Sequence, residues 1–92
     1  MSNHRQTVEI TNKKGLHARA SAKFVTYVSK LSDEVSVKVA KDGTEVTGTS
    51  IMGLMMLGAA KGDTIDIIVE GENAESTLKK LVGLVFDGFG ED

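Results

Sequence analysis

The chain has 92 residues and a net charge of −2, with 40% hydrophobic and 26% charged residues. This size predicts a single domain spanning residues 1–92, and the composition is that of a globular protein rather than a disordered one. The acidic balance argues against general nucleic-acid binding, which needs many Lys and Arg contacts to phosphates. With no cysteine and two histidines, the chain offers no disulfide and no ordinary metal-ligand set, so we expect neither metal nor cofactor. We find no signal sequence or apolar span and expect a cytoplasmic protein without membrane contact.

The first predicted elements are a strand, a helix and a second strand. Residues 7–11 and 35–39 alternate polar and apolar side chains, which is typical of strands with one buried face. Residues 17–31 are predicted as an amphipathic helix, because apolar side chains recur there at helical spacing. These side chains are Phe24, Val28 and Leu31.

The middle of the chain predicts a hairpin, a short helix and a further strand. Asp42-Gly43 tolerates the positive φ of a type I′ turn and should lead into a strand over residues 44–47. Residues 50–57 are apolar and rich in Met, which favours a short helix that begins at Ser50. Residues 64–67 alternate again and are predicted as the last strand.

The final element is predicted to be a helix with Asn73 as its N-cap. Its apolar stripe comprises Ala74, Leu78, Leu81, Val82 and Val85. Gly88 and Gly90 are expected to fray its end. The order β-α-β-β-α-β-α, with three helices for one sheet face, predicts an α+β open-faced sandwich.

The candidate functional segment of the chain is residues 12–19, which run from a polar turn into the first helix. His17 is placed at the helix N-terminus, where unpaired backbone N–H groups favour an anion. The positive helix end and Arg19 should keep the imidazole a neutral nucleophile at cellular pH. Lys13, Lys14 and Lys23 make this end of the helix basic. A histidine beside an arginine is nevertheless a weak pattern, and on spacing alone an exposed histidine without a role fits equally well.

Two longer motifs settle that choice. Gly15-Leu16-His17-Ala18-Arg19, followed by Ala20-Ser21-Ala22-Lys23-Phe24-Val25, closely resembles the phosphohistidine loop of the histidine-containing phosphocarrier (HPr) family. Thr49-Ser50-Ile51-Met52-Gly53-Leu54-Met55-Met56-Leu57-Gly58 resembles the second signature of that family. The resemblance extends over nearly the whole chain and implies the HPr-like open-faced β-sandwich, a four-stranded antiparallel sheet covered on one face by three helices.

The resemblance implies that His17 accepts a phosphoryl group on Nδ1 from enzyme I of the phosphoenolpyruvate-dependent phosphotransferase system. The group would then pass to an enzyme IIA-type acceptor, so the protein would be a monomeric relay rather than an enzyme. Arg19 would stabilise the phosphoryl group. Asn12 lies near the active histidine in relatives, although a turn-forming role fits it as well. His4 is expected in a frayed terminus without a role.

Ser50 matches the regulatory serine that an ATP-dependent HPr kinase/phosphorylase modifies in some bacteria. A phosphate on this N-cap would add about two negative charges beside a partner surface. An N-cap that is never modified is the alternative. The resemblance implies that Ile51, Met52 and Met55 form that docking surface, whereas Leu54 and Leu57 are expected in the core.

Ala20 departs from the family, in which most members have proline at this position. Alanine here, together with the Met-rich second signature, resembles the nitrogen-related phosphocarriers (NPr), whose output is regulatory rather than sugar uptake. Two functions of other classes also fit parts of the pattern. One is a purely regulatory docking protein controlled through Ser50, and the other is an α/β sandwich that binds a metabolite or RNA. The low aromatic content, 4%, disfavours RNA.

Overall fold

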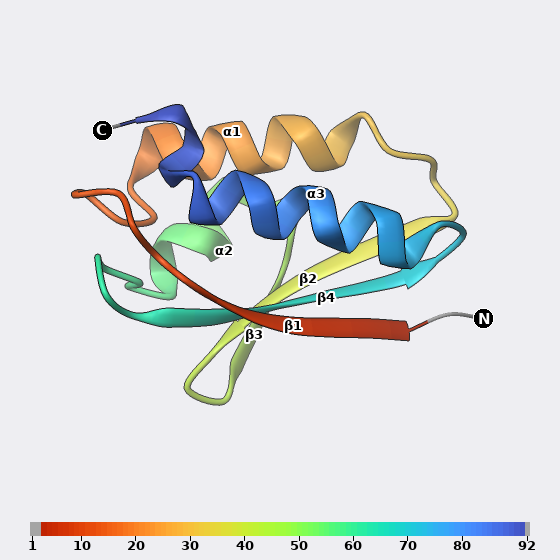
Figure 1. Cartoon of the computed structure of the whole chain (residues 1–92), viewed down its shortest axis with the longest axis horizontal. Coiled ribbons are helices and arrows are strands. Elements are labelled where there is room, and N and C mark those ends of the chain that lie inside the picture. The colour runs from red at the N-terminus through yellow and green to blue at the C-terminus, as the bar shows by residue number, and fades with distance from the viewer. Residues whose placement is uncertain (1–2, 92) are drawn as a thin grey trace.

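The computed structural model describes residues 3–91 and contains one antiparallel sheet (Figure 1). Its strands are β1 (Asn3–Glu9), β2 (Val35–Lys41), β3 (Thr44–Thr47) and β4 (Thr64–Gly71). They lie in the order β1-β4-β2-β3, and every neighbouring pair is antiparallel. The helices are α1 (Ala18–Ser29), α2 (Ile51–Met56) and α3 (Ala74–Phe86), followed by the short 3-10 turn η1 (Gly88–Gly90).

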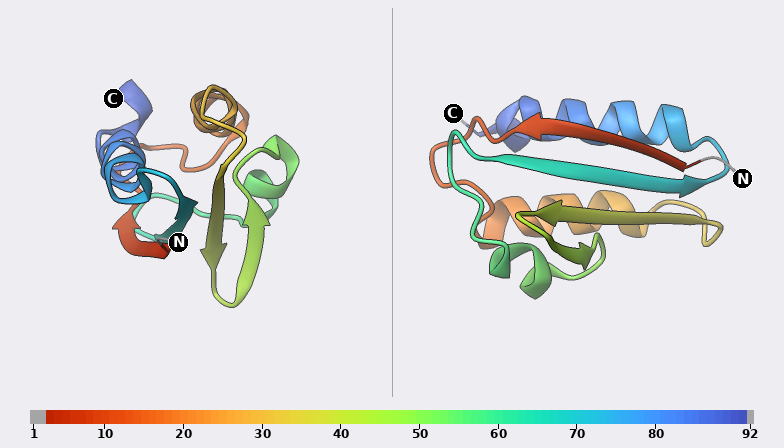
Figure 2. Two further views of the ribbon diagram at one scale, coloured as in Figure 1. Left: turned by 90° about the vertical axis from the view of Figure 1, so that its right-hand side faces the viewer. Right: turned by 90° about the horizontal axis from the view of Figure 1, so that it is seen from below.

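The helices lie on one face of the sheet, as the end-on view in Figure 2 shows. The alternation along the strands explains this arrangement, because side chains of successive residues point to opposite faces. In β4, Ile65, Ile67 and Val69 are buried under the helices, whereas Asp66 and Ile68 between them reach the open face and are partly exposed. The predicted open-faced α+β sandwich is therefore confirmed, including the element order.

The Asp42-Gly43 turn joins β2 to β3 with φ values of 51° and 84°. Both central residues are thus left-handed, as a type I′ turn requires. The turn predicted from these two residues is confirmed.

Two local predictions were wrong, and a third was confirmed only in part. His4 is not frayed but lies inside β1, opposite Val69 of β4. Asn73 precedes α3 as predicted, yet it has a left-handed backbone (φ 57°) and makes no side-chain cap hydrogen bond. The glycines after α3 do not fray the chain, because they flank Phe89, which is 1% exposed and packs into the core.

Candidate functional site

Phosphohistidine loop

The loop between β1 and α1 is fixed by contacts that only glycine allows at its centre. Gly15 has φ 61°, and a Cβ at this position would collide with the Ala59 carbonyl oxygen and lie 2.8 Å from the Cα of Ala60. The next amide, Leu16 N–H, donates to the same Ala59 oxygen at 3.0 Å. The loop before His17 is therefore clamped against the segment that leads into β4.

His17 is the N-cap of α1, as the sequence predicts. Its backbone is extended (φ −75°, ψ −178°), and its carbonyl accepts the Ser21 N–H at 2.9 Å. Its Nδ1 lies 3.4 Å from the backbone nitrogen of Arg19, whose N–H points at it. The Nδ1 atom of the ring thus faces the first turn of the helix, where free N–H groups and the helix dipole favour an anion.

A basic cleft of about 720 Å³ opens beside His17. Four basic side chains and one carboxylate line it: Lys13, Lys14, Arg19, Lys23 and Glu91. The cleft combines a ring nitrogen, backbone donors and surplus positive charge, which are the groups that an oxyanion such as phosphate requires.

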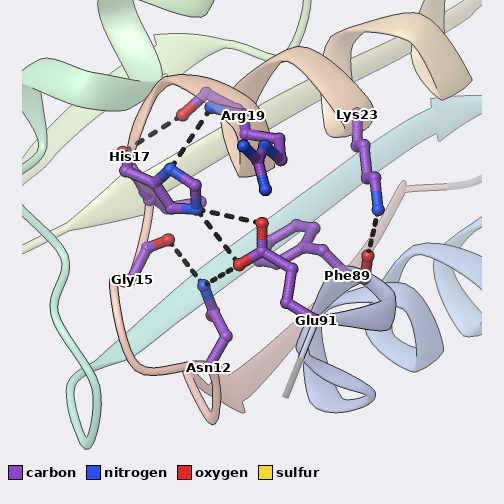
Figure 3. Close-up of polar contacts among 9 residues, drawn as sticks. Asn12, Gly15, His17, Arg19, Lys23, Phe89 and Glu91 are labelled. Atoms are coloured by element: carbon purple, nitrogen blue, oxygen red, sulfur yellow. Dashed lines mark hydrogen bonds and ion pairs between the residues drawn. The ribbon is translucent and has the colours of Figure 1, made fainter.

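Asn12, His17 and Glu91 form a chain of polar contacts (Figure 3). The Asn12 Nδ2 donates to the Gly15 carbonyl at 2.8 Å and to the Glu91 carboxylate at 3.1 Å. Asn12 is 1% exposed, and its Oδ1 has no hydrogen-bond partner among residues 3–91. A buried oxygen without a hydrogen-bond partner is destabilising, and the two hydrogen bonds of the amide nitrogen offset this cost.

Glu91 is the residue of the site that the sequence analysis missed. Both of its carboxylate oxygens lie 3.1 Å from the Nε2 of His17. The basic surroundings predicted for the ring therefore also include one carboxylate. Nothing in the local sequence signals the contact, since 74 residues separate the two partners.

Second signature

Ser50 caps α2 as predicted, because its Oγ accepts the Gly53 N–H at 2.9 Å. It does not reach the cleft beside His17, but α2 packs against α1, the helix that carries this histidine. The side chains of Leu54 and Leu57 are buried, as expected.

The outer surface of α2 is apolar and exposed. Ile51 is 41% exposed, Met52 70% and Met55 42%, so all three side chains are accessible, as a docking role requires. The structure adds Met56, at 79% exposure, which the sequence analysis did not include. We call these four residues the α2 patch. Exposed apolar clusters of this kind are typical of protein interaction surfaces.

In the part of the chain that the structure describes, no helix is long and apolar enough to cross a membrane. Within residues 3–91, no group of three or more His, Asp or Glu side chains is arranged to hold a metal ion.

Comparison with known proteins

A protein-family model described as the PTS HPr component phosphorylation site matches residues 4–87. The chain is 46% identical over 87 residues to phosphocarrier protein HPr of Neisseria meningitidis. The aligned region covers 95% of this chain and 96% of that protein. It is 39% identical over 88 residues to phosphocarrier protein NPr of Escherichia coli K12, covering 96% and 97% of the two chains.

A solved structure shows the same fold. The crystal structure of HPr-C-His from Thermoanaerobacter tengcongensis superimposes with a TM-score of 0.88 at 43% identity, covering 97% of this chain and 98% of that one. Fold and site together define a protein of the phosphocarrier class. The chain belongs to the HPr family of the phosphotransferase system, which confirms the resemblance seen in the sequence.

Proposed function

We propose that this protein is a phosphoryl relay in which His17 receives the phosphoryl group from phospho-enzyme I and donates it to an enzyme IIA-type acceptor. The observation that carries the proposal is the position of the His17 ring. Its Nδ1 faces the first turn of α1 and borders a cleft with four basic side chains. On this basis the protein is a carrier that its partner enzymes modify, not a catalyst.

The chemistry needs little beyond this geometry. Phosphoryl transfer passes through a loose transition state, so the carrier contributes positioning and charge stabilisation rather than covalent activation. The lone pair of Nδ1 attacks phosphorus while the bond to the donor breaks. Arg19, the lysines of the cleft and the amides of the first turn then neutralise the phosphoryl oxygens.

The accessible α2 patch supports a docking role beside the relay histidine. Methionine side chains adapt to several shapes, which suits a carrier that must bind donor and acceptor in turn. Ser50 caps the helix that bears this patch, so its phosphorylation by an HPr kinase/phosphorylase would place negative charge at the docking surface.

The test is to incubate the protein with phosphoenolpyruvate and enzyme I and to map the modified residue. We expect label on His17 that is lost in acid and stable in base, as for a phosphoramidate, and passage of the label to an enzyme IIA. Labelling should be absent in His17→Ala and retained in His4→Ala. Labelling of the His17→Ala variant would overturn the proposal. Modification of Ser50 alone by a protein kinase would favour the purely regulatory docking protein instead.

A further inference from the structure

The segment after α3 folds back over the start of α1 and is held there by three contacts. Phe89 is buried in the core although its φ is 58°. Its carbonyl accepts from the Lys23 Nζ at 2.8 Å, and the Phe86 carbonyl accepts from the Thr11 Oγ1 at 2.8 Å. A left-handed backbone is unfavourable for phenylalanine, so the surrounding packing must hold it in place. The chain is thus anchored at Phe86 and Phe89, shortly before Glu91.

This anchoring presents the Glu91 carboxylate to the ring of His17. The Glu91 side chain is only 17% exposed, and it is shared between the ring and the Asn12 amide (Figure 3). Its hydrogen bond to His17, and then that to Asn12, hold the pKa of the Glu91 carboxyl below its usual range. The carboxylate is therefore ionised at neutral pH and can only accept hydrogen bonds.

The contacts on the two ring nitrogens specify one tautomer. Because an ionised carboxylate accepts, the Nε2 atom of His17 must carry a proton to bond with Glu91. The N–H of Arg19 is aimed at Nδ1, so this nitrogen presents its lone pair. Both contacts favour the same form of the ring, with the proton on Nε2 and the nucleophilic pair on Nδ1.

We propose that Glu91 is a positioning residue for phosphoryl transfer, which holds His17 as the Nε2–H tautomer and directs the lone pair of Nδ1 toward the incoming phosphoryl group. The proposal rests on the phosphocarrier function proposed above. Glu91 lies outside residues 4–87, the span that the family model matches, so the match to the family does not by itself assign it a role.

The step balances without another acid or base. The Nδ1 lone pair forms the bond to phosphorus, the bond from phosphorus to the donor atom of phospho-enzyme I breaks, and that donor atom keeps the electron pair. The proton on Nε2 stays in place, so the ring becomes a cation. The Glu91 carboxylate compensates this positive charge, much as a carboxylate steadies the imidazolium that forms in hydrolase triads. In the reverse step the ring leaves as a neutral imidazole.

The other charges at the site have a separate task. Arg19, Lys13, Lys14 and Lys23 line the cleft and can pair with phosphoryl oxygens, but cations cannot stabilise a charged ring. Glu91 is the carboxylate among the residues that line this cleft. A contrasting role is that of a placeholder, in which Glu91 occupies the basic cleft and must leave before phosphate arrives. The two roles predict opposite effects of removing its charge.

The test uses Glu91→Gln in the full chain, which keeps the size of the side chain while removing its charge. The amide of glutamine can donate to Nε2, so it permits the other tautomer. We expect ¹⁵N NMR of the unphosphorylated protein to show a mixture of His17 tautomers in this variant and a single Nε2–H form in the wild type. His4 supplies an internal reference in the same spectra.

Phosphorylation kinetics with enzyme I supply the second measurement. We expect kcat to fall by about 10- to 100-fold, by analogy with the loss found when a carboxylate that orients a metal-bound histidine is removed, with KM for the carrier little changed. Glu91→Asp, which keeps the charge, should recover part of the rate. Glu72→Gln is the control, because it removes the same charge from an exposed turn before α3.

Unchanged tautomers together with an unchanged kcat in Glu91→Gln would overturn the inference. A faster rate would also overturn it and would favour the placeholder. These results are distinct from failure of the proposed function, which would appear as absence of His17 labelling in the wild type, and the NMR measurement does not depend on enzyme I.

Discussion

Gly15 and Ala59 are in such close contact that the backbone at residue 15 has no room for a side chain. A Cβ there would meet the Ala59 carbonyl oxygen, the same atom that accepts the Leu16 N–H. The position of His17 thus depends on a glycine two residues earlier and on a segment more than 40 residues later in the chain. Alanine substitutions at Gly15 and at a second left-handed glycine can therefore separate the cost of backbone strain from the cost of the collision with Ala59.

Gly15→Ala should destabilise the protein by more than the roughly 1–2 kcal/mol that a left-handed alanine costs, because the new Cβ also collides with backbone. Gly58→Ala is the matched control. Gly58 has a similar φ, 66°, but a Cβ there would meet nothing within 4 Å.

Chemical denaturation of the two variants gives both free energies of unfolding. We expect Gly15→Ala to lose clearly more stability than Gly58→Ala, and to slow labelling of His17 because the loop is displaced. Equal losses would show that the loop relaxes away from Ala59 at no cost.

Asp66 on the open sheet face is predicted to contribute stability that acid removes. Thr7 Oγ1 donates to its carboxylate at 2.6 Å, and Arg5 donates through Nε at 3.0 Å and through Nη2 at 2.7 Å. The hydrogen bond from Thr7, and then that from Arg5, hold the pKa of the Asp66 carboxyl below its usual range. A folded pKa below the unfolded one means that stability is present above about pH 4 and is lost as pH falls through the folded pKa.

Asp66→Asn should therefore lower the free energy of unfolding at pH 7 by roughly 0.2–1 kcal/mol, the usual range for exposed pairs. The variant should also flatten the pH dependence of stability below pH 4. Urea titrations between pH 7 and pH 2 measure both effects. Glu9→Gln removes a carboxylate from the same sheet and serves as the control, and an equally flat profile in that variant would contradict a specific role for Asp66.

Ser50→Asp is predicted to keep the fold and slow the transfer. Aspartate also caps helices, so it should replace the Ser50 bond to Gly53, whereas Ser50→Ala should lose about 1 kcal/mol. The added carboxylate lies at the start of α2 and should repel an acidic partner surface.

The initial rate of His17 phosphorylation by enzyme I measures this effect, and the difference from wild type should shrink as salt screens the charge. Ser76→Asp, at an exposed position on α3, adds the same charge at a distance. Equal rates for Ser50→Asp and wild type at low salt would show that Ser50 does not influence the carrier step.

The elements that sequence analysis predicted well are those with local physical causes. The burial pattern of β4, the Asp42-Gly43 turn and the Ser50 cap each depend on a few neighbouring residues. The motif around His17 also placed the histidine at the start of α1, where the structure has it.

The missed features depend on contacts between residues far apart in the chain. Glu91 reaches His17 from a segment in which Phe89 is buried, whereas the two glycines beside that phenylalanine suggested a frayed end. His4 looked terminal in the sequence, yet pairing with β4 extends β1 to include it. Asn73 has a residue type that favours capping and does precede α3, but its backbone is left-handed and its side chain makes no cap hydrogen bond.

The last prediction concerns Ala20, which stands where most members of the family that the motif resembles have proline. The structure places Ala20 third in α1, after Ala18 and Arg19. The first N–H groups of a helix have no intrahelical acceptor, so proline at this position removes no helical hydrogen bond. It also restricts the unfolded chain. Ala20→Pro should then raise the free energy of unfolding by roughly 0.4–1 kcal/mol.

In a domain of this size, that gain corresponds to an increase of a few degrees in Tm. Ala18→Pro is the comparison, since it restricts the unfolded chain in the same way at an exposed position that follows the extended backbone of His17. Ala20 is completely buried, so the ring of a proline at this position must also fit against the core. A gain in both variants would show that the first turn has room for proline at either position. A gain in Ala18→Pro with a fall in Ala20→Pro would show that packing around residue 20, and not the hydrogen bonding of the helix start, favours alanine in this chain.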